Sequence, residues 1–309
     1  MAEWRGPAVF RCRVIDYDYE HDYGHEHDVS AVQITKILET LIRSGPNMSI
    51  HPTAIIDSRA ELATGVEVQA YSIIGPRVTI GEGTIVGPHC VIDGRTVIGE
   101  RNHFFSGAQI GVPSQDLKHG TGLVGRLAMG DGNVVREHAS ISASTHSSEA
   151  DEHRVTSIGD NCLIMTCAHV GHDSRVGSHV ILANYVALAG HVSVEDRAIV
   201  GGLVAVHQFC RIGELAMVGG TTRVWNDAPP YMITDGNPAR CGGPNKVGLQ
   251  RNGYDEPARK RIKAMYKLMW RSHLNTSQAL ERIENEVEDS PEKIKFVEFV
   301  RTSTRGITR

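Results

Sequence analysis

The apolar residues of this chain recur with a period of six, and this period limits the possible folds more than any other feature. Steps of six from Ile50 to Ile110, and again from Ile158 to Val224, meet a large apolar residue each time. An amphipathic helix needs apolar residues spaced by about 3.6, and a half-buried strand needs a spacing of two. The pattern therefore indicates very short strands, each followed by a corner.

The fourth residue after each large apolar residue is slim, as Ala168, Val186 and Cys210 illustrate. Three six-residue units would close one triangular coil of about 18 residues, with the large and slim residues inside. Only 6% of the residues are aromatic, which suits a prism too narrow for rings. The pattern resembles the hexapeptide repeats of the left-handed parallel β-helix, an exception to the usual right-handed crossover. We therefore predict an all-β left-handed parallel β-helix of roughly nine coils, a triangular prism, followed by a C-terminal α-helical domain.

The predicted organisation has three parts. Residues 1–49 form an N-terminal extension with one amphipathic helix over 29–43. Residues 50–230 form the prism, into which loops 112–128 and 144–157 are inserted; loops that leave a rigid scaffold often carry binding groups. Residues 231–309 form the helical domain, with helices expected over 256–270 and 277–287 and a third that begins at Ser290-Pro291.

Composition excludes several classes of protein. The formal charge of -4 provides no basic field for nucleic acid, so we expect no nucleic-acid partner. The chain has no apolar run long enough for a transmembrane segment, and we expect it to be soluble. The six cysteines are too few for a disulfide scaffold. Cys90, Cys162 and Cys210 occupy the slim inward position, and the other three show no metal-ligand spacing.

One wall of the predicted prism gathers histidines. Units that begin 18 residues apart stack on the same wall, and neighbouring strands lie about 4.8 Å apart. Four histidines fall at positions that point outward from this wall: His169, His172, His191 and His207. Asp173 follows His172 directly, and the same step of 18 aligns Gly190 and Gln208 with His172.

This cluster fits general-base chemistry better than covalent catalysis. No serine or cysteine stands beside the histidines in a nucleophile motif. A histidine base needs a partner that fixes its tautomer and a backbone N–H that holds the developing oxyanion. His172, Asp173 and Gly190 could supply these three roles.

Five segments carry a specific resemblance. They are 165–173, 188–194, 205–210, Ala228-Pro-Pro-Tyr231 and Ser303-Thr-Arg-Gly306. Together they resemble the UDP-N-acetylglucosamine O-acyltransferases, which perform the first acylation of lipid A biosynthesis. The resemblance implies transfer of an (R)-3-hydroxyacyl group from acyl carrier protein to the 3-hydroxyl of UDP-N-acetylglucosamine. It implies no cofactor and no metal, since phosphopantetheine of the carrier holds the acyl group.

The resemblance also implies roles for individual residues. His172 would be the base, Asp173 would orient it, and Gly190 would supply the oxyanion N–H. The positions implied in substrate binding are Gln115, Asp116, Lys118, His169, His191, His207, Gln208, Asn245 and Arg251. Gly220 falls where the family limits chain length, and a glycine there suits a longer acyl chain. Ser142 and Val247 depart from the family's polar substrate contacts.

Partners and location follow from the same resemblance. It implies a homotrimer with three sites between subunits. A basic cluster in the C-terminal part would meet the acidic carrier protein: Lys246, Arg251, Arg259, Lys260, Arg261 and Lys263. We expect a cytoplasmic protein if the source is bacterial, and a mitochondrial or plastid one if the 49-residue arm reflects a eukaryotic organelle.

Three other functions remain open from the sequence. The chain could be an N-acyltransferase that acts on a later glucosamine intermediate of the pathway. It could resemble the γ-class carbonic anhydrases, with zinc held by His169, His172 and His191. It could also be a scaffold that kept the fold without catalysis.

Overall fold

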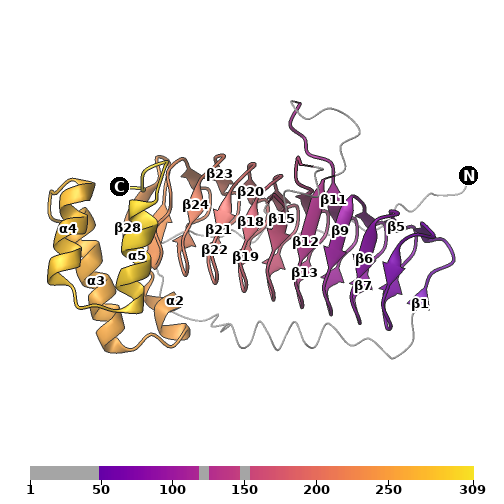
Figure 1. Cartoon of the computed structure of the whole chain (residues 1–309), viewed down its shortest axis with the longest axis horizontal. Helices are drawn as coiled ribbons and strands as arrows, with labels where there is room; N and C mark the ends of the chain where they lie inside the picture. Colours follow the sequence, from indigo (N-terminus) through magenta and orange to yellow (C-terminus); the bar gives the residue numbers. More distant parts are fainter. Residues whose placement is uncertain (1–48, 118–124, 147–153) are drawn as a thin grey trace, which may run out of the picture.

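A computed structural model describes residues 49–117, 125–146 and 154–309, so the predicted helix over 29–43 lies outside the described residues. The described chain forms a long triangular prism with helices at its C-terminal end (Figure 1). Three sheets, named walls W1, W2 and W3, run along the prism, and the chain passes from W1 to W2 to W3 in each coil. The predicted fold class is confirmed.

The strands are two to five residues long. W1 contains β1 (Ser49–Ile50), β4 (Glu67–Val68), β7 (Ile85–Val86), β10 (His103–Phe104), β13 (Val134–Val135), β16 (Leu163–Ile164), β19 (Ile181–Leu182), β22 (Ile199–Val200), β25 (Met217–Val218), β27 (Met232–Asp235) and β28 (Arg240–Pro244). W2 contains β2 (Ile55–Ile56), β5 (Ile73–Ile74), β8 (Val91–Ile92), β11 (Gln109–Val112), β14 (Ser140–Ser142), β17 (His169–Val170), β20 (Ala187–Leu188), β23 (Ala205–Val206) and β26 (Arg223–Val224). W3 contains β3 (Glu61–Leu62), β6 (Val78–Ile80), β9 (Arg95–Ile98), β12 (Arg126–Met129), β15 (Thr156–Ile158), β18 (Arg175–Val176), β21 (Ser193–Val194) and β24 (Arg211–Ile212).

The core of the prism consists of the residues that the period of six predicted to point inward. Large aliphatic residues such as Val170 and Leu188 are fully buried, and so are slim residues such as Ala168 and Cys210. Phe104 is also fully buried in this core. The prism is therefore wide enough for one ring, which the sequence argument did not expect.

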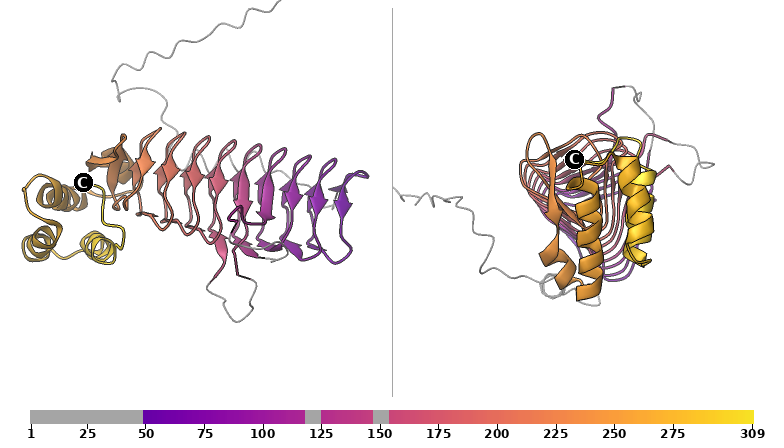
Figure 2. Two further views of the ribbon diagram at one scale, coloured as in Figure 1. Left: turned by 90° about the horizontal axis from the view of Figure 1, so that it is seen from above. Right: turned by 90° about the vertical axis from the view of Figure 1, so that its left-hand side faces the viewer.

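The corners use a left-handed backbone conformation. Asp173, His191 and Phe209 have φ values of 58°, 61° and 65°, and most other corners repeat this conformation. Strands joined by such corners pair in parallel with the next coil, for example His169 with Ala187. This repeated geometry stacks the same corner of successive coils along one edge of the prism (Figure 2).

The C-terminal part begins with a hairpin that the sequence did not predict. Strand β27 continues W1 in parallel with β25, and β28 returns antiparallel to β27. Four helices follow: α2 (Lys246–Arg251), α3 (Glu256–Trp270), α4 (Thr276–Glu286) and α5 (Pro291–Arg301). They lie across the end of the prism (Figure 2). The three longer helices match the predicted segments within one residue at each predicted boundary.

The helical part has its own buried core. Ile262, Met265 and Ile283 are fully buried there, and Phe296 packs with them. Ser290 caps α5 by accepting a hydrogen bond from the Lys293 N–H, as the Ser-Pro signal indicated. In the described part of the chain, none of the helices is both long and apolar enough to cross a membrane.

Candidate active site

The edge between W2 and W3 carries the histidines and both insertions. The turn from β17 to β18 contains His172 and Asp173, and the turn from β20 to β21 contains Gly190 and His191. The insertions replace the turns from β11 to β12 and from β14 to β15, which belong to the same edge. Both insertions thus lie on the same edge as the turns that contain His172 and His191.

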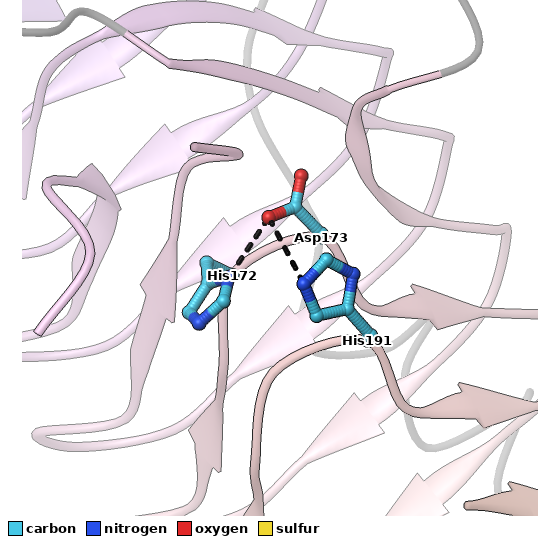
Figure 3. A group of neighbouring side chains, drawn as sticks. All are labelled: His172, Asp173 and His191. Carbon is cyan, nitrogen blue, oxygen red and sulfur yellow. Dashed lines mark hydrogen bonds and ion pairs between the residues drawn. The ribbon is translucent and has the colours of Figure 1, made fainter. Parts of the chain in front are cut away.

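His172 and Asp173 form a hydrogen-bonded pair (Figure 3). His172 Nδ1 lies 2.8 Å from Asp173 Oδ2, and the side chains of His172 and Asp173 are only 9% and 6% exposed. Burial by itself would raise the pKa of Asp173, but hydrogen bonds from His172 and Thr145 hold that pKa below its ordinary value of 3.8. The carboxylate is therefore ionised at neutral pH and can only accept. In the neutral form of the ring, this contact places the proton on His172 Nδ1 and the lone pair on Nε2.

Gly190 lies directly against the other side of the His172 ring. A Cβ atom built on Gly190 would be 2.4 Å from His172 Nε2 and 2.5 Å from its Cε1, so any side chain there would displace the His172 ring. Among the described residues, the Gly190 N–H donates no backbone hydrogen bond, while its carbonyl accepts one from Phe209 at 3.4 Å. The Gly190 N–H is thus not used by the backbone hydrogen bonds of the described coils, and the residue lies beside His172 Nε2.

His191 completes the group. Its Nε2 lies 3.9 Å from Asp173 Oδ2, and its ring meets the His172 ring edge-on at a centroid distance of 5.1 Å (Figure 3). Phe209, one coil further on, stacks on the His191 ring at 4.7 Å. His172, Asp173 and His191 each offer one ligand atom within 4.8 Å of the others, so this arrangement is also compatible with a metal ion.

His169 has a separate environment. Its Nδ1 lies 2.8 Å from the Ser140 Oγ of the preceding strand on W2. Burial, assisted by the nearby His172, lowers the pKa of His169 below 6.5. His169 is not part of the group of possible metal ligands found among the described residues, in which Asp173 takes its place.

His207 lies one coil further along the same edge, where the C-terminal tail returns to the prism. Its ring stacks on Trp225 at 4.7 Å, and Arg305 places Nη2 3.2 Å from its Nδ1. Ser303 donates a hydrogen bond of 2.7 Å to Asp227, which anchors the tail to the last coil. Gln208 is exposed beside His207.

Three predicted site residues lie on other edges of the same chain. Gly220 follows β25 on the W1/W2 edge, where an added Cβ would meet only the Gly202 carbonyl oxygen at 3.3 Å and the Gly202 nitrogen at 3.9 Å. Asn245 caps α2, and its Nδ2 donates to the Leu215 carbonyl at 2.9 Å on the W3/W1 edge. Arg251 ends α2 and is exposed.

The first insertion starts on the W2/W3 edge with the His172 turn. Gln115 is exposed there, and the Asp116 N–H donates to the Ser114 Oγ at 3.1 Å. Lys118 lies outside the described residues. Of the two departures from the family pattern, Ser142 is buried at the end of β14 and Val247 is 55% exposed on α2.

Basic side chains surround a groove of about 880 Å³ between the hairpin and α3. Its basic lining residues are Lys246, Lys263, Lys267 and Arg271. Arg261 of the predicted basic cluster does not line this groove and instead forms ion pairs with Glu292 and Glu288, at 2.6 and 3.1 Å. Lys267 and Arg271 were not part of the predicted cluster.

Sequence reasoning missed several groups that contact the histidines. Phe209 and Trp225 follow His191 and His207 by one coil, so the step of 18 could have found both stacking partners. Ser140 precedes His169 by 29 residues, which is one coil once the 11 inserted residues are removed. Thr145 and Thr156 contact Asp173 from the ends of an insertion, where no period applies.

Comparisons with known proteins identify a family for this chain. The model described as Udp N-acetylglucosamine O-acyltransferase, domain 2, matches residues 227–308, and the bacterial transferase hexapeptide model matches residues 156–190. The acyl-[acyl-carrier-protein]–UDP-N-acetylglucosamine O-acyltransferase of Pseudomonas entomophila is 46% identical over 84% of this chain and 99% of its own length. That of Herminiimonas arsenicoxydans is 45% identical over the same shares.

Solved structures lead to the same family. The UDP-N-acetylglucosamine acyltransferase of Francisella novicida has a TM-score of 0.80 at 37% identity, over 84% of this chain and 94% of that one. The Arabidopsis enzyme has a TM-score of 0.62 at 31% identity, over 86% of this chain and all of that one. The chain is therefore an acyltransferase and belongs to the acyl-[acyl-carrier-protein]–UDP-N-acetylglucosamine O-acyltransferase family.

Proposed function

We propose that this protein transfers an (R)-3-hydroxyacyl group from acyl carrier protein to the 3-hydroxyl of UDP-N-acetylglucosamine, the first step of lipid A biosynthesis, with His172 as general base. The observation that carries the mechanism is the buried 2.8 Å contact between His172 Nδ1 and Asp173 Oδ2, with Gly190 packed beside Nε2. The names of the relatives support the substrates.

In this mechanism the sugar hydroxyl gives its proton to His172 Nε2 as its oxygen attacks the thioester carbonyl carbon. Asp173 stabilises the imidazolium that forms and keeps the ring oriented. The carbonyl oxygen becomes an oxyanion, which the Gly190 N–H stabilises. The tetrahedral intermediate then collapses to the ester, the carbon–sulfur bond breaks, and the phosphopantetheine thiol leaves with the proton from His172.

The positions of the other predicted residues support a homotrimer with shared sites. His172 lies on the W2/W3 edge, whereas Asn245 and Arg251 belong to a part packed on the W3/W1 edge, and Gly220 lies on the W1/W2 edge. A flat outer edge cannot enclose a substrate by itself. In a parallel trimer one protomer's W2/W3 edge could face another edge of its neighbour, which would bring these groups together.

Donor, acceptor and chain length are assigned on the same basis. Gln115, Asp116 and Lys118 would hold the nucleotide sugar, and His169, His191 and Gln208 would contact the substrate or the acyl chain, with His207 beside them. The Asn245 side chain caps α2, so Arg251 is the stronger candidate for contact with the diphosphate. The basic groove beside α3 would receive the acidic carrier protein, and the absence of a side chain at Gly220 would admit a longer acyl chain. The bacterial relatives favour the cytoplasm as its location.

Two alternatives make different predictions. An N-acyltransferase would acylate an amino sugar in place of UDP-N-acetylglucosamine. A zinc-dependent carbonic anhydrase would hold stoichiometric zinc tied to bicarbonate turnover, and the His172, Asp173 and His191 donors are the observation in its favour. Family membership argues against both alternatives.

The decisive experiment measures acyl transfer from 3-hydroxyacyl carrier protein to UDP-N-acetylglucosamine by the wild type and by His172→Ala. Loss of a general base lowers kcat by about 10²- to 10⁴-fold. An amino-sugar acceptor and metal analysis in the same preparation separate the two alternatives. If a folded His172→Ala variant keeps the wild-type rate, the general-base mechanism is wrong; if neither protein acylates UDP-N-acetylglucosamine, the assigned activity is wrong.

A further inference from the structure

Both ends of the connection from β14 to β15 converge on Asp173. Thr145 lies three residues after β14, and Thr156 is the first residue of β15. Each hydroxyl forms a hydrogen bond with Asp173. The insertion that breaks the repeat thus supplies two contacts to the acid that holds His172.

Thr145 binds the carboxylate itself. Its Oγ1 donates to Asp173 Oδ2 at 2.7 Å, and its backbone N–H lies 3.3 Å from both carboxylate oxygens. Oδ2 is the same oxygen that accepts from His172 Nδ1 at 2.8 Å. Thr145 is only 7% exposed, so water does not compete freely for these contacts.

Thr156 fixes the backbone of the same residue. Its Oγ1 accepts a hydrogen bond of 2.8 Å from the Asp173 N–H, and Thr156 is fully buried. Asp173 has a φ of 58°, a region that residues with a side chain rarely occupy. Thr156 holds the Asp173 backbone and Thr145 holds its carboxylate. The two contacts together fix the orientation of the carboxylate that faces His172.

We propose that Thr145 is a positioning residue for the acyl-transfer base: its hydroxyl fixes Asp173 Oδ2 so that His172 keeps its proton on Nδ1 and its lone pair on Nε2. This inference rests on the proposed role of His172. Without the Thr145 hydroxyl, Oδ2 can rotate away from the ring, and His172 can adopt the tautomer that cannot accept the sugar proton.

The lowered pKa of Asp173 agrees with this role. Burial is the largest influence and raises that pKa, and the bonds from His172 and from the Thr145 side chain and backbone more than offset it. Thr145 therefore favours the ionised acceptor that the pair requires.

The test compares Thr145→Val, which removes the hydroxyl and keeps the shape, with Thr145→Ser, which restores a hydroxyl. We expect kcat to fall about 10- to 100-fold in the valine variant, as for residues that orient a functional histidine. We expect both KM values to remain within about twofold and serine to recover most of kcat, because Thr145 acts through Asp173 and not on substrate. Thr84→Val is the matched control, since Thr84 is a buried threonine whose hydroxyl donates to the Gly99 carbonyl and accepts from the Asn102 N–H within the regular coil.

A double-mutant cycle with Asp173→Ala makes the test independent of folding effects at Thr145. If Thr145 acts through Asp173, the valine substitution lowers kcat by less than about twofold in the Asp173→Ala background. If the Thr145→Val variant does not fold, Thr145→Ala is used in its place. Wild-type kcat in a folded Thr145→Val variant, failure of serine to restore kcat, or additive losses would overturn the proposal. If His172→Ala is inactive and Thr145→Val is fully active, only the inference about Thr145 is wrong. If His172→Ala is active, the proposed role of His172 as general base is wrong.

Discussion

The ring of His172 packs directly against Gly190, such that an added Cβ on Gly190 would be 2.4 Å from His172 Nε2. Gly190 is not among the residues with positive φ, so alanine is excluded by contact and not by backbone strain. We expect Gly190→Ala to displace the imidazole and to lower kcat by about 10²- to 10⁴-fold, the contribution of a positioned general base. Steady-state acyl-transfer rates measure this effect.

Gly202 offers a folding control for that substitution. It occupies the equivalent corner position in the repeat, on the W1/W2 edge, and an added Cβ there would meet only the Asn184 carbonyl at 3.4 Å. We expect Gly202→Ala and Gly190→Ala to keep the wild-type melting temperature within a few degrees, since His172 lies at the outer edge. Full activity of Gly190→Ala would show that the ring does not need this contact.

Burial of His169 gives the protein a pH-dependent stability. Burial and the nearby His172 lower its pKa in the folded state below the ordinary 6.5. As the pH falls through 6.5, the unfolded chain takes up a proton that the folded chain does not yet bind, so the free energy of unfolding decreases. The penalty stops growing once the pH is below the folded pKa.

His169→Gln removes the pH-dependent contribution of His169 to the free energy of unfolding, and the glutamine still offers Ser140 a hydrogen-bond partner. We expect the variant to lose less stability than the wild type between about pH 7.5 and pH 5.5. Urea unfolding at several pH values measures the difference. Parallel curves for the two proteins would show that His169 titrates normally.

The space beside Gly220 predicts a change in acyl-chain selectivity. An added Cβ has only the Gly202 carbonyl and nitrogen within 4 Å, and the position has no positive φ, so a larger side chain requires only that the Gly202 carbonyl shift by a few tenths of an ångström. We expect Gly220→Met to favour shorter acyl donors by about 10- to 200-fold per excess methylene. Competition between carrier-bound acyl chains of different length measures it, and unchanged selectivity would place the end of the chain elsewhere.

The regular part of this molecule could be predicted because one short period determines both core and surface. A step of 18 placed His172, Gly190 and Gln208 at neighbouring turns, and these turns are neighbours in the structure. The same arithmetic failed at the insertions, because the contacts of Thr145 and Thr156 with Asp173 depend on how the connection folds and not on register.

The C-terminal part was predicted in its helices but not in its hairpin. α3 and α5 have apolar spacing and cap signals that depend on local sequence. Strand β28 contains Gly242 and Gly243, so its sequence shows no alternation of apolar and polar residues. It forms a strand because it pairs with β27. Asn245 was predicted to contact substrate, but the local signal that it carries is an N-cap for α2.

Sites shared between protomers predict complementation between two inactive variants. His172→Ala removes the base from one edge, and Arg251→Ala removes the basic side chain at the end of α2, which packs against a different edge. If each site takes His172 from one protomer and Arg251 from its neighbour, each variant alone has no intact site. In randomly mixed trimers, about one interface in four pairs an intact His172 with an intact Arg251. Tandem purification after co-expression with two different affinity tags removes the unmixed trimers and raises this share to one interface in three, so about a third of the wild-type kcat per site should be recovered. Mixed trimers no more active than the single variants would place both residues in the same protomer's site.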